Sequence, residues 1–168
     1  AVPPPNSGMD APLFYQLLVG ELELRTGQAG VAYQVLLDAA RRTKDVELFK
    51  RVINIALQAR AGDQALIASK AWRDALPESL EAQQMTLQLL AVLNRPGDIA
   101  DPLRAVLEMT PEAQRGAVLA SLPRLFQRAA EPKRVQAALE PLLQGYAKQP
   151  ATRAPALAAQ ARLALMAG

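Results

Sequence analysis

The chain has 168 residues, of which 51% are hydrophobic and 4% aromatic, and this length is sufficient for one sizeable core. The scarcity of aromatic residues argues for close-packed helices and against a β-sandwich or barrel. Cys and His are absent, which excludes a disulfide scaffold, a thiolate zinc site and a catalytic Cys or His. The formal net charge of +3 is too small to indicate nucleic-acid binding by itself.

The first residues are predicted to form a flexible tether ahead of a folded domain. Residues 1–9 contain three consecutive prolines among small residues, a composition typical of an extended segment. A helix is predicted over residues 12–25, where apolar residues follow helical spacing, Asp10 is a candidate N-cap and Pro12 suits the first turn. The next clear helical pattern spans residues 46–60.

Helix breaks recur at a fixed interval along the chain. Gly27, Gly62 and Gly97 are 35 residues apart, and a left-handed glycine can end a helix while the Asp that follows Gly62 and Gly97 caps the next one. A second series of breaks falls around residues 43–45, 76–79, 110–112 and 149–151. The two series predict helix–turn–helix units over residues 10–44, 45–77, 78–110 and 111–150, and a terminal half unit at 151–168. The expected result is one repeat domain over residues 10–168 with about nine helices, kinked or broken at Pro123 and Pro141.

Small and large apolar residues also recur within these units. Gly20, Ala56 and Ala91 are aligned as small residues where two helices approach closely, and Trp72 is aligned with Leu36 as the large core residue that fills the gap. This pattern resembles the tetratricopeptide repeat, whose units of about 34 residues carry small residues, a large apolar residue and a proline at such offsets. The resemblance implies an all-α fold, an α-solenoid of antiparallel helix pairs wound as a right-handed superhelix.

Two segments resemble a narrower group of proteins. Residues 9–21 and 55–60 are similar to the opening of proteobacterial tetratricopeptide lipoproteins, which are anchored to the outer membrane and work in the periplasm. One branch of that group is similar to a scaffold that delivers substrates to a carboxyl-terminal processing protease. The resemblance implies a periplasmic location, with the membrane reached only through a lipid anchor absent from this chain; a cytoplasmic location is the alternative.

The resemblance also places the first helix of each unit on the inner wall of the superhelix. We therefore predict a groove for a peptide or partner protein on this wall. Its candidate residues are Phe14, Leu17, Glu21, Leu24, Lys50, Ile53, Arg60, Met85, Gln88 and Arg95. The alternative for the apolar members is packing against a neighbouring unit.

Basic residues are the remaining candidates for a binding role. Arg25, Arg60 and Arg95 are 35 residues apart and lie near predicted helix ends, where a cation stabilises the helix dipole. Alternatively, the three form an array that captures a carboxylate ligand. The basic run at residues 41–44 lacks interleaved aromatic residues and is interpreted as a solvated helix end rather than a nucleic-acid site.

These observations together predict a non-catalytic interaction scaffold that needs neither a cofactor nor a metal. Its partner would be a protein or peptide, in the role of an adaptor for a periplasmic protease or for cell-envelope assembly. The alternative is a structural module that self-associates, for example as a homodimer, through its exposed repeat ends.

Overall fold

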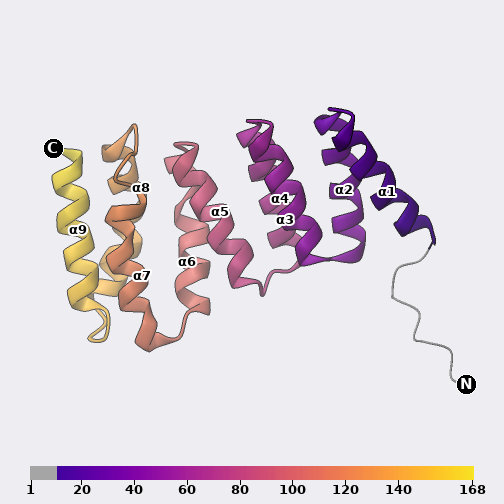
Figure 1. Cartoon of the computed structure of the whole chain (residues 1–168). Helices are drawn as coiled ribbons and strands as arrows, with labels where there is room; N and C mark the ends of the chain where they lie inside the picture. Colours follow the sequence, from indigo (N-terminus) through magenta and orange to yellow (C-terminus); the bar gives the residue numbers. More distant parts are fainter. Residues whose placement is uncertain (1–10) are drawn as a thin grey trace, which may run out of the picture. The chain divides into compact units, whose positions relative to one another are not determined.

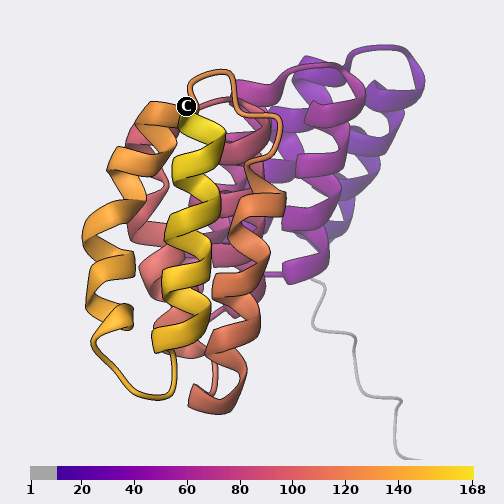
Figure 2. The ribbon, with the colours of Figure 1, turned by 90° about the vertical axis from the view of Figure 1, so that its left-hand side faces the viewer.

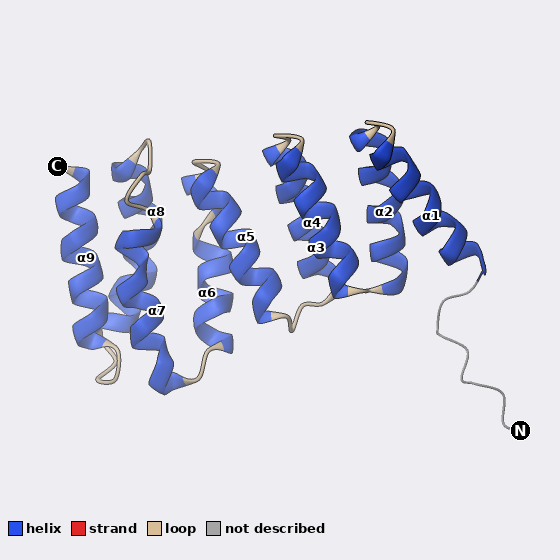
Figure 3. Ribbon diagram, in the orientation of Figure 1, coloured by secondary structure: helices blue, strands red, loops and turns tan. Residues whose placement is uncertain are grey.

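The computed structural model describes residues 11–168, which form nine α-helices and one short 3-10 helix and contain no strand (Figure 3). The predicted all-α class is confirmed for this part of the chain. The predicted tether at residues 1–9 and the N-cap candidate Asp10 lie outside the described residues. The helices group into two compact units, which divide between Leu76 and Pro77.

The first unit contains four helices in two consecutive pairs (Figure 1). They are α1 (Ala11–Arg25), α2 (Ala29–Thr43), α3 (Val46–Gln58) and α4 (Gly62–Ala75). Helix α1 packs on α2, α2 packs on α3 and also reaches α4, and α3 packs on α4. Each helix therefore contacts the helix that follows it in sequence.

The second unit contains five α-helices and the 3-10 helix. They are α5 (Leu80–Val92), η1 (Pro96–Asp98), α6 (Ala100–Met109), α7 (Glu112–Leu125), α8 (Pro132–Ala147) and α9 (Arg153–Ala167). Helix α5 packs on α6, and both η1 and α6 contact α8. Helix α9 packs against both α7 and α8, and Figure 2 shows it in yellow in front of them.

Two of the four helices that follow the second series of breaks, α3 and α5, begin where a short side chain caps the first turn. Asp45 precedes α3 and accepts hydrogen bonds from the backbone N–H groups of Glu47 (2.8 Å) and Leu48 (3.3 Å). Ser79 precedes α5 and accepts one from the N–H of Ala82 (3.2 Å). These bonds satisfy donors that have no partner inside the helix. The breaks predicted at 43–45 and 76–79 are confirmed, whereas the grouping of helices into one repeat domain stays a prediction.

The glycine series gives the correct turns, but only Gly27 is the left-handed residue of its turn. The backbone is left-handed at Gly27 (φ 84°), Arg60 (φ 57°) and Asn94 (φ 53°), after α1, α3 and α5. At each turn this residue donates its N–H to the carbonyl three residues back, and the next residue donates to the carbonyl five back. This is the Schellman arrangement that closes a helix end. Gly62 is instead the first residue of α4, and Gly97 lies inside η1. The predicted capping by the Asp that follows each glycine is therefore wrong, because Ala61 and Ile99 hold the N-cap positions of α4 and α6.

The core of the first unit contains both kinds of residue that the alignment singled out. Gly20 is buried, and a Cβ built on it would lie 2.6 Å from Cδ2 of Leu36, so the predicted close approach of α1 and α2 is confirmed. Trp72 is fully buried, as predicted, and its ring stacks on Phe49 with centroids 6.3 Å apart and planes 9° apart.

The two internal prolines do not break their helices. Helix α7 continues past Pro123 to Leu125, and α8 continues through Pro141 to Ala147. Of the two expected outcomes, a break is wrong at both prolines, and a kink stays a prediction. Each proline removes one N–H donor from its helix, and the remaining backbone of the helix stays helical.

Candidate binding groove between α5, α6 and α7

The second unit contains an open groove with a volume of about 430 Å³. This volume is within the range of roughly 300–1,000 Å³ typical of ligand sites. The groove is lined by residues of three helices: Gln84, Leu87 and Gln88 of α5, Val106 of α6, and Val118, Ser121, Arg124 and Leu125 of α7. All three helices belong to residues 77–168, so the groove lies within one compact unit.

The floor of the groove is apolar. Leu87 and Val106 are 5% and 2% exposed, and Val118 and Leu125 are half-buried. Helical spacing explains the arrangement on α7, because residues three, four and seven positions apart share one face of a helix. Val118, Ser121 and Leu125 therefore point to the same side.

The walls of the groove carry polar groups that have no partner in the described part of the chain. Gln84 and Gln88 are exposed on α5, one helical turn apart. Arg124 is exposed on α7 and is the one charged side chain among the lining residues. Ser121 donates its hydroxyl to the carbonyl of Val118 at 2.6 Å, which leaves the hydroxyl oxygen free to accept a bond.

A smaller pocket of about 220 Å³ lies in the first unit. It is lined by Ala29, Gly30, Tyr33, Gln34, Ile55, Ala56, Ala59, Ala61 and Gln64. The Tyr33 hydroxyl donates to the carbonyl of Gln64 at 2.8 Å, and burial raises the pKa of this phenol, with Arg41 opposing the shift. Its lining includes the carboxamides of Gln34 and Gln64 but no charged side chain, so it could orient a polar ligand only through uncharged groups.

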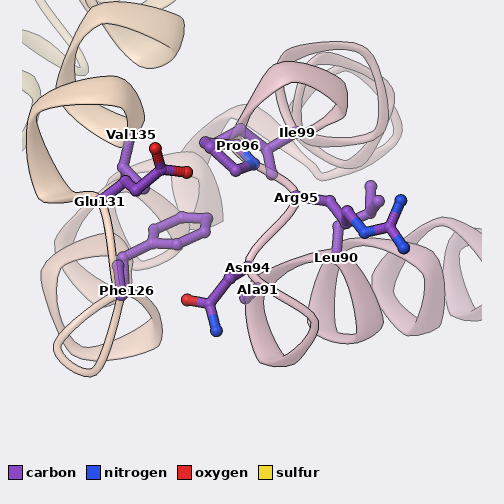
Figure 4. Close-up of a pocket in the computed structure, with 10 residues that line it drawn as sticks. Leu90, Ala91, Asn94, Arg95, Pro96, Ile99, Phe126, Glu131 and Val135 are labelled. Atoms are coloured by element: carbon purple, nitrogen blue, oxygen red, sulfur yellow. The ribbon is translucent and has the colours of Figure 1, made fainter. Parts of the chain in front are cut away.

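A third pocket, shown in Figure 4, lies where the end of α5 meets the segment between α7 and α8. Its volume is about 10 Å³, the size of a single water site. Asn94 Oδ1 accepts a hydrogen bond from the N–H of Ala130 at 2.8 Å, which ties the two segments together. Arg95 also lines this pocket, but in Figure 4 its guanidinium points away from Phe126 and Glu131. We interpret this pocket as a packing gap.

Of the three candidate residues predicted on α5 and its following turn, one lies in the groove. Gln88 lines it. Met85 is half-buried on α5 but does not line the groove, and Arg95 is exposed beside the third pocket.

The candidates predicted on α3 are divided between core and surface. Ile53 is 1% exposed and belongs to the core, so its predicted place on an open wall is wrong. The reason is that α3 packs against both α2 and α4, which leaves it little free surface. Lys50 is half-buried and pairs with Glu47 at 3.5 Å. Arg60 is exposed, but it is the left-handed residue of the turn after α3.

The candidates predicted on α1 do not line any of these pockets. Phe14 is 59% exposed, and Leu17 and Leu24 are half-buried. Glu21 accepts two hydrogen bonds from Arg51 of α3, from Nε at 3.2 Å and from a terminal nitrogen at 2.9 Å. Its carboxylate is therefore already paired within the unit.

The predicted ladder of Arg25, Arg60 and Arg95 does not occupy equivalent positions. Arg25 is the last residue of α1, Arg60 is itself the left-handed residue of its turn, and Arg95 follows the left-handed residue Asn94. The spacing of 35 residues thus misses the turn register, which recurs after 33 and 34 residues. An array built from equivalent positions is therefore wrong.

Sequence reasoning missed most of the groove. Gln84, Ser121 and Arg124 were not among the candidates, although Gln84 precedes Gln88 by one helical turn and this spacing could have indicated it. The residues on α7 had no comparable signal, because their register depends on how α7 lies against α5 and α6.

Two other features, a metal site and a membrane-spanning helix, are not found among the described residues. Residues 11–168 contain no group of three or more acidic side chains that could hold a metal ion. None of the helices in this part of the chain combines the length and the apolar character needed to cross a bilayer. Comparison of the sequence with protein-family models and with curated proteins finds no match.

Proposed function

We propose that the chain is a non-catalytic interaction scaffold that binds a peptide or a partner protein in the groove between α5, α6 and α7. The observation that carries this proposal is the combination of an apolar floor with two carboxamides and a guanidinium on the walls, none of which has a partner among the described residues. Such surfaces recognise peptides because the floor supplies affinity and the walls supply orientation.

The proposed architecture is an α-solenoid of the tetratricopeptide type. Three observations support it: each helix of the first unit contacts the helix that follows it in sequence, the Schellman turns recur after 33 and 34 residues, and Gly20 lets two helices approach closely. In such a solenoid the first helix of each pair lines the binding surface. The proposed role is that of an adaptor in the periplasm, for a processing protease or for cell-envelope assembly.

Peptide selection tests the proposed groove. Random heptapeptides displayed on phage are selected against the protein, and the enriched peptides are then measured on Ser121→Trp, which fills the groove, and on Ala120→Trp. Ala120 is exposed on α7 and does not line the groove, so it is the matched control. We expect binding to be lost in Ser121→Trp and kept in Ala120→Trp, with circular dichroism showing that both remain helical. Equal binding by all three proteins would mean that the groove is not the binding site.

Self-association is a second candidate function, favoured by an exposed apolar stripe on α1. Phe14, Tyr15, Leu18 and Leu22 are 59%, 69%, 46% and 52% exposed, and helical spacing brings them to one side of the helix. Contiguous apolar surface of this kind often marks a protein interface. Sedimentation of the protein and of Leu18→Glu tests it: a dimer that dissociates in the variant supports self-association, and a wild-type monomer at high concentration contradicts it.

A further inference from the structure

The chemistry of the groove walls points to a particular kind of ligand. We propose that the groove between α5, α6 and α7 binds an extended peptide segment in which an aliphatic side chain and an acidic side chain are two residues apart. The proposal rests on the proposed function and adds the class of peptide that this site selects.

The groove is open along its surface, so a bound segment needs to place only one of its faces inside it. An extended segment can place one of its faces inside the groove.

The α5 wall suits the backbone of such a segment. An extended chain brings N–H and C=O groups that need partners when water is displaced. Gln84 and Gln88 each offer a carboxamide with two N–H donors and an acceptor, and neither is hydrogen-bonded to the described residues. Their Cβ atoms, one helical turn apart, are separated by about 5–6 Å, close to the spacing of about 6.6 Å between alternate residues of a strand.

The floor and the α7 wall determine which side chains the segment carries. Leu87, Val106, Val118 and Leu125 form an apolar floor that suits an aliphatic side chain. Arg124 on the opposite wall makes no ion pair with the described residues, and no carboxylate lines the groove. A guanidinium can bind a carboxylate through two parallel hydrogen bonds.

The two side chains must point to the same side of the peptide to reach the floor and Arg124 together. Alternate residues of an extended chain point to the same face, which sets a spacing of two residues. Because the groove is open at its surface, the peptide backbone can enter and leave, and a side-chain carboxylate of Asp or Glu reaches Arg124 without a free chain end. The ligand is therefore an internal segment.

Fluorescence anisotropy with a designed probe tests the proposal. The probe is the fluorescein-labelled, amidated peptide Gly-Ser-Ile-Ser-Glu-Ser-Gly, and its two controls replace the Glu by Gln or the Ile by Ser. We expect each replacement to weaken binding about tenfold, because charge-assisted hydrogen bonds and burial of an aliphatic side chain each contribute at least this much.

Variants of the protein separate the charge contact from a general loss of binding. Arg124→Gln should weaken binding of the Glu probe about tenfold and leave the Gln probe unchanged, because the two changes remove the same contact. Arg128→Gln is the control, since Arg128 is exposed shortly after α7 and does not line the groove. It should bind both probes as the wild-type protein does.

The outcomes distinguish this inference from the proposed function. Equal affinity of the Glu and Gln probes, tighter binding of a probe whose carboxylate is its free C-terminus, or no binding at about 1 mM probe would each overturn the inference. If Ser121→Trp still abolishes binding of phage-selected peptides, and those peptides lack Asp and Glu, the groove stands as a binding site and only its assigned chemistry is wrong. If Ser121→Trp has no effect on any peptide, the proposed function is wrong as well.

Discussion

Replacing Gly20 by Ala tests how closely α1 and α2 approach. Gly20 is buried within α1, and a Cβ at this position would lie 2.6 Å from Cδ2 and 2.7 Å from Cγ of Leu36. Ordinary contacts between carbon atoms are about 3.5–4.0 Å long. Leu36 would have to withdraw by about 1 Å, and rotation of one methyl group would not suffice because Cγ is also too close.

Two opposing terms determine the expected change in stability. Ala is favoured over Gly in a helix interior by about 0.5–1 kcal/mol. Overpacking of a filled core costs about 1–3 kcal/mol, and Leu36 is only 1% exposed, so it has little space into which it can move. We expect Gly20→Ala to lower the free energy of unfolding by about 0.5–2 kcal/mol.

Urea denaturation followed by tryptophan fluorescence measures this change. Trp72 is the single tryptophan of the chain and is buried in the same unit as Gly20 and Leu36, so its emission reports on that unit. Gly30→Ala is the matched control, because Gly30 lies in α2 and its added Cβ would meet no atom within 4 Å. This control should leave the protein equally stable or slightly more stable.

A double-mutant cycle identifies the cause. Leu36→Ala alone should cost about 2–5 kcal/mol, but it removes the atoms that clash with Ala at position 20. The double variant should therefore be more stable than the sum of the single effects predicts, by at least about 1 kcal/mol. A Gly20→Ala protein as stable as the wild type, or additive effects in the cycle, would refute the close contact between these helices.

Three further predictions concern the first unit. Trp72→Ala should lower the free energy of unfolding by about 3–5 kcal/mol, measured by circular dichroism in urea, and a loss below about 1 kcal/mol would contradict its place in the core. Arg60→Gly should raise it by about 1 kcal/mol, because a left-handed backbone costs less for Gly; an unchanged urea midpoint would show that no strain is released. Burial raises the pKa of Tyr33, so the folded state keeps this proton to higher pH than the unfolded state. Stability is then lost as the pH rises above about 10, and Tyr33→Phe should lose less of it between pH 10 and 11; identical pH profiles would argue against this.

Helix boundaries were predictable because they depend on neighbours in sequence. Asp45 and Ser79 cap α3 and α5 with hydrogen bonds to residues two or three positions ahead. A cap that bonds to residues so close in sequence can be recognised from a few consecutive residues.

The faces of the helices were less predictable than their ends. On α3, Val52, Ile53, Ile55 and Ala56 are all buried, because α2 and α4 contact this helix from two sides. Apolar periodicity identifies an exposed face only when a helix packs on one side. The assignment of Ile53 to an open wall failed for this reason.

The groove depends on the separation of α5 and α7, which no local pattern encodes. Gln88 was predicted because the resemblance to the tetratricopeptide repeat places it on the inner wall of its unit, and it is exposed on α5. Ser121 and Arg124 share a helix with Pro123, and Phe126, which follows this helix, is buried. The irregular composition of this unit hid the register of α7.

The three arginines show that the same residue type at a fixed interval does not guarantee equivalent positions in the fold. The hydrogen bonds of each turn define the equivalent positions more reliably. Relative to the left-handed residue of each turn, Arg25 lies two positions before Gly27, Arg60 is that residue itself, and Arg95 lies one position after Asn94. Arg25 ends α1, whereas Arg60 and Arg95 lie in turns beyond the ends of α3 and α5, so the three side chains share no helical face. Arg124 belongs to no such series, yet α7 places it on a wall of the groove. The position of a charge in the fold, rather than its repetition in the sequence, therefore determines whether it can meet a ligand.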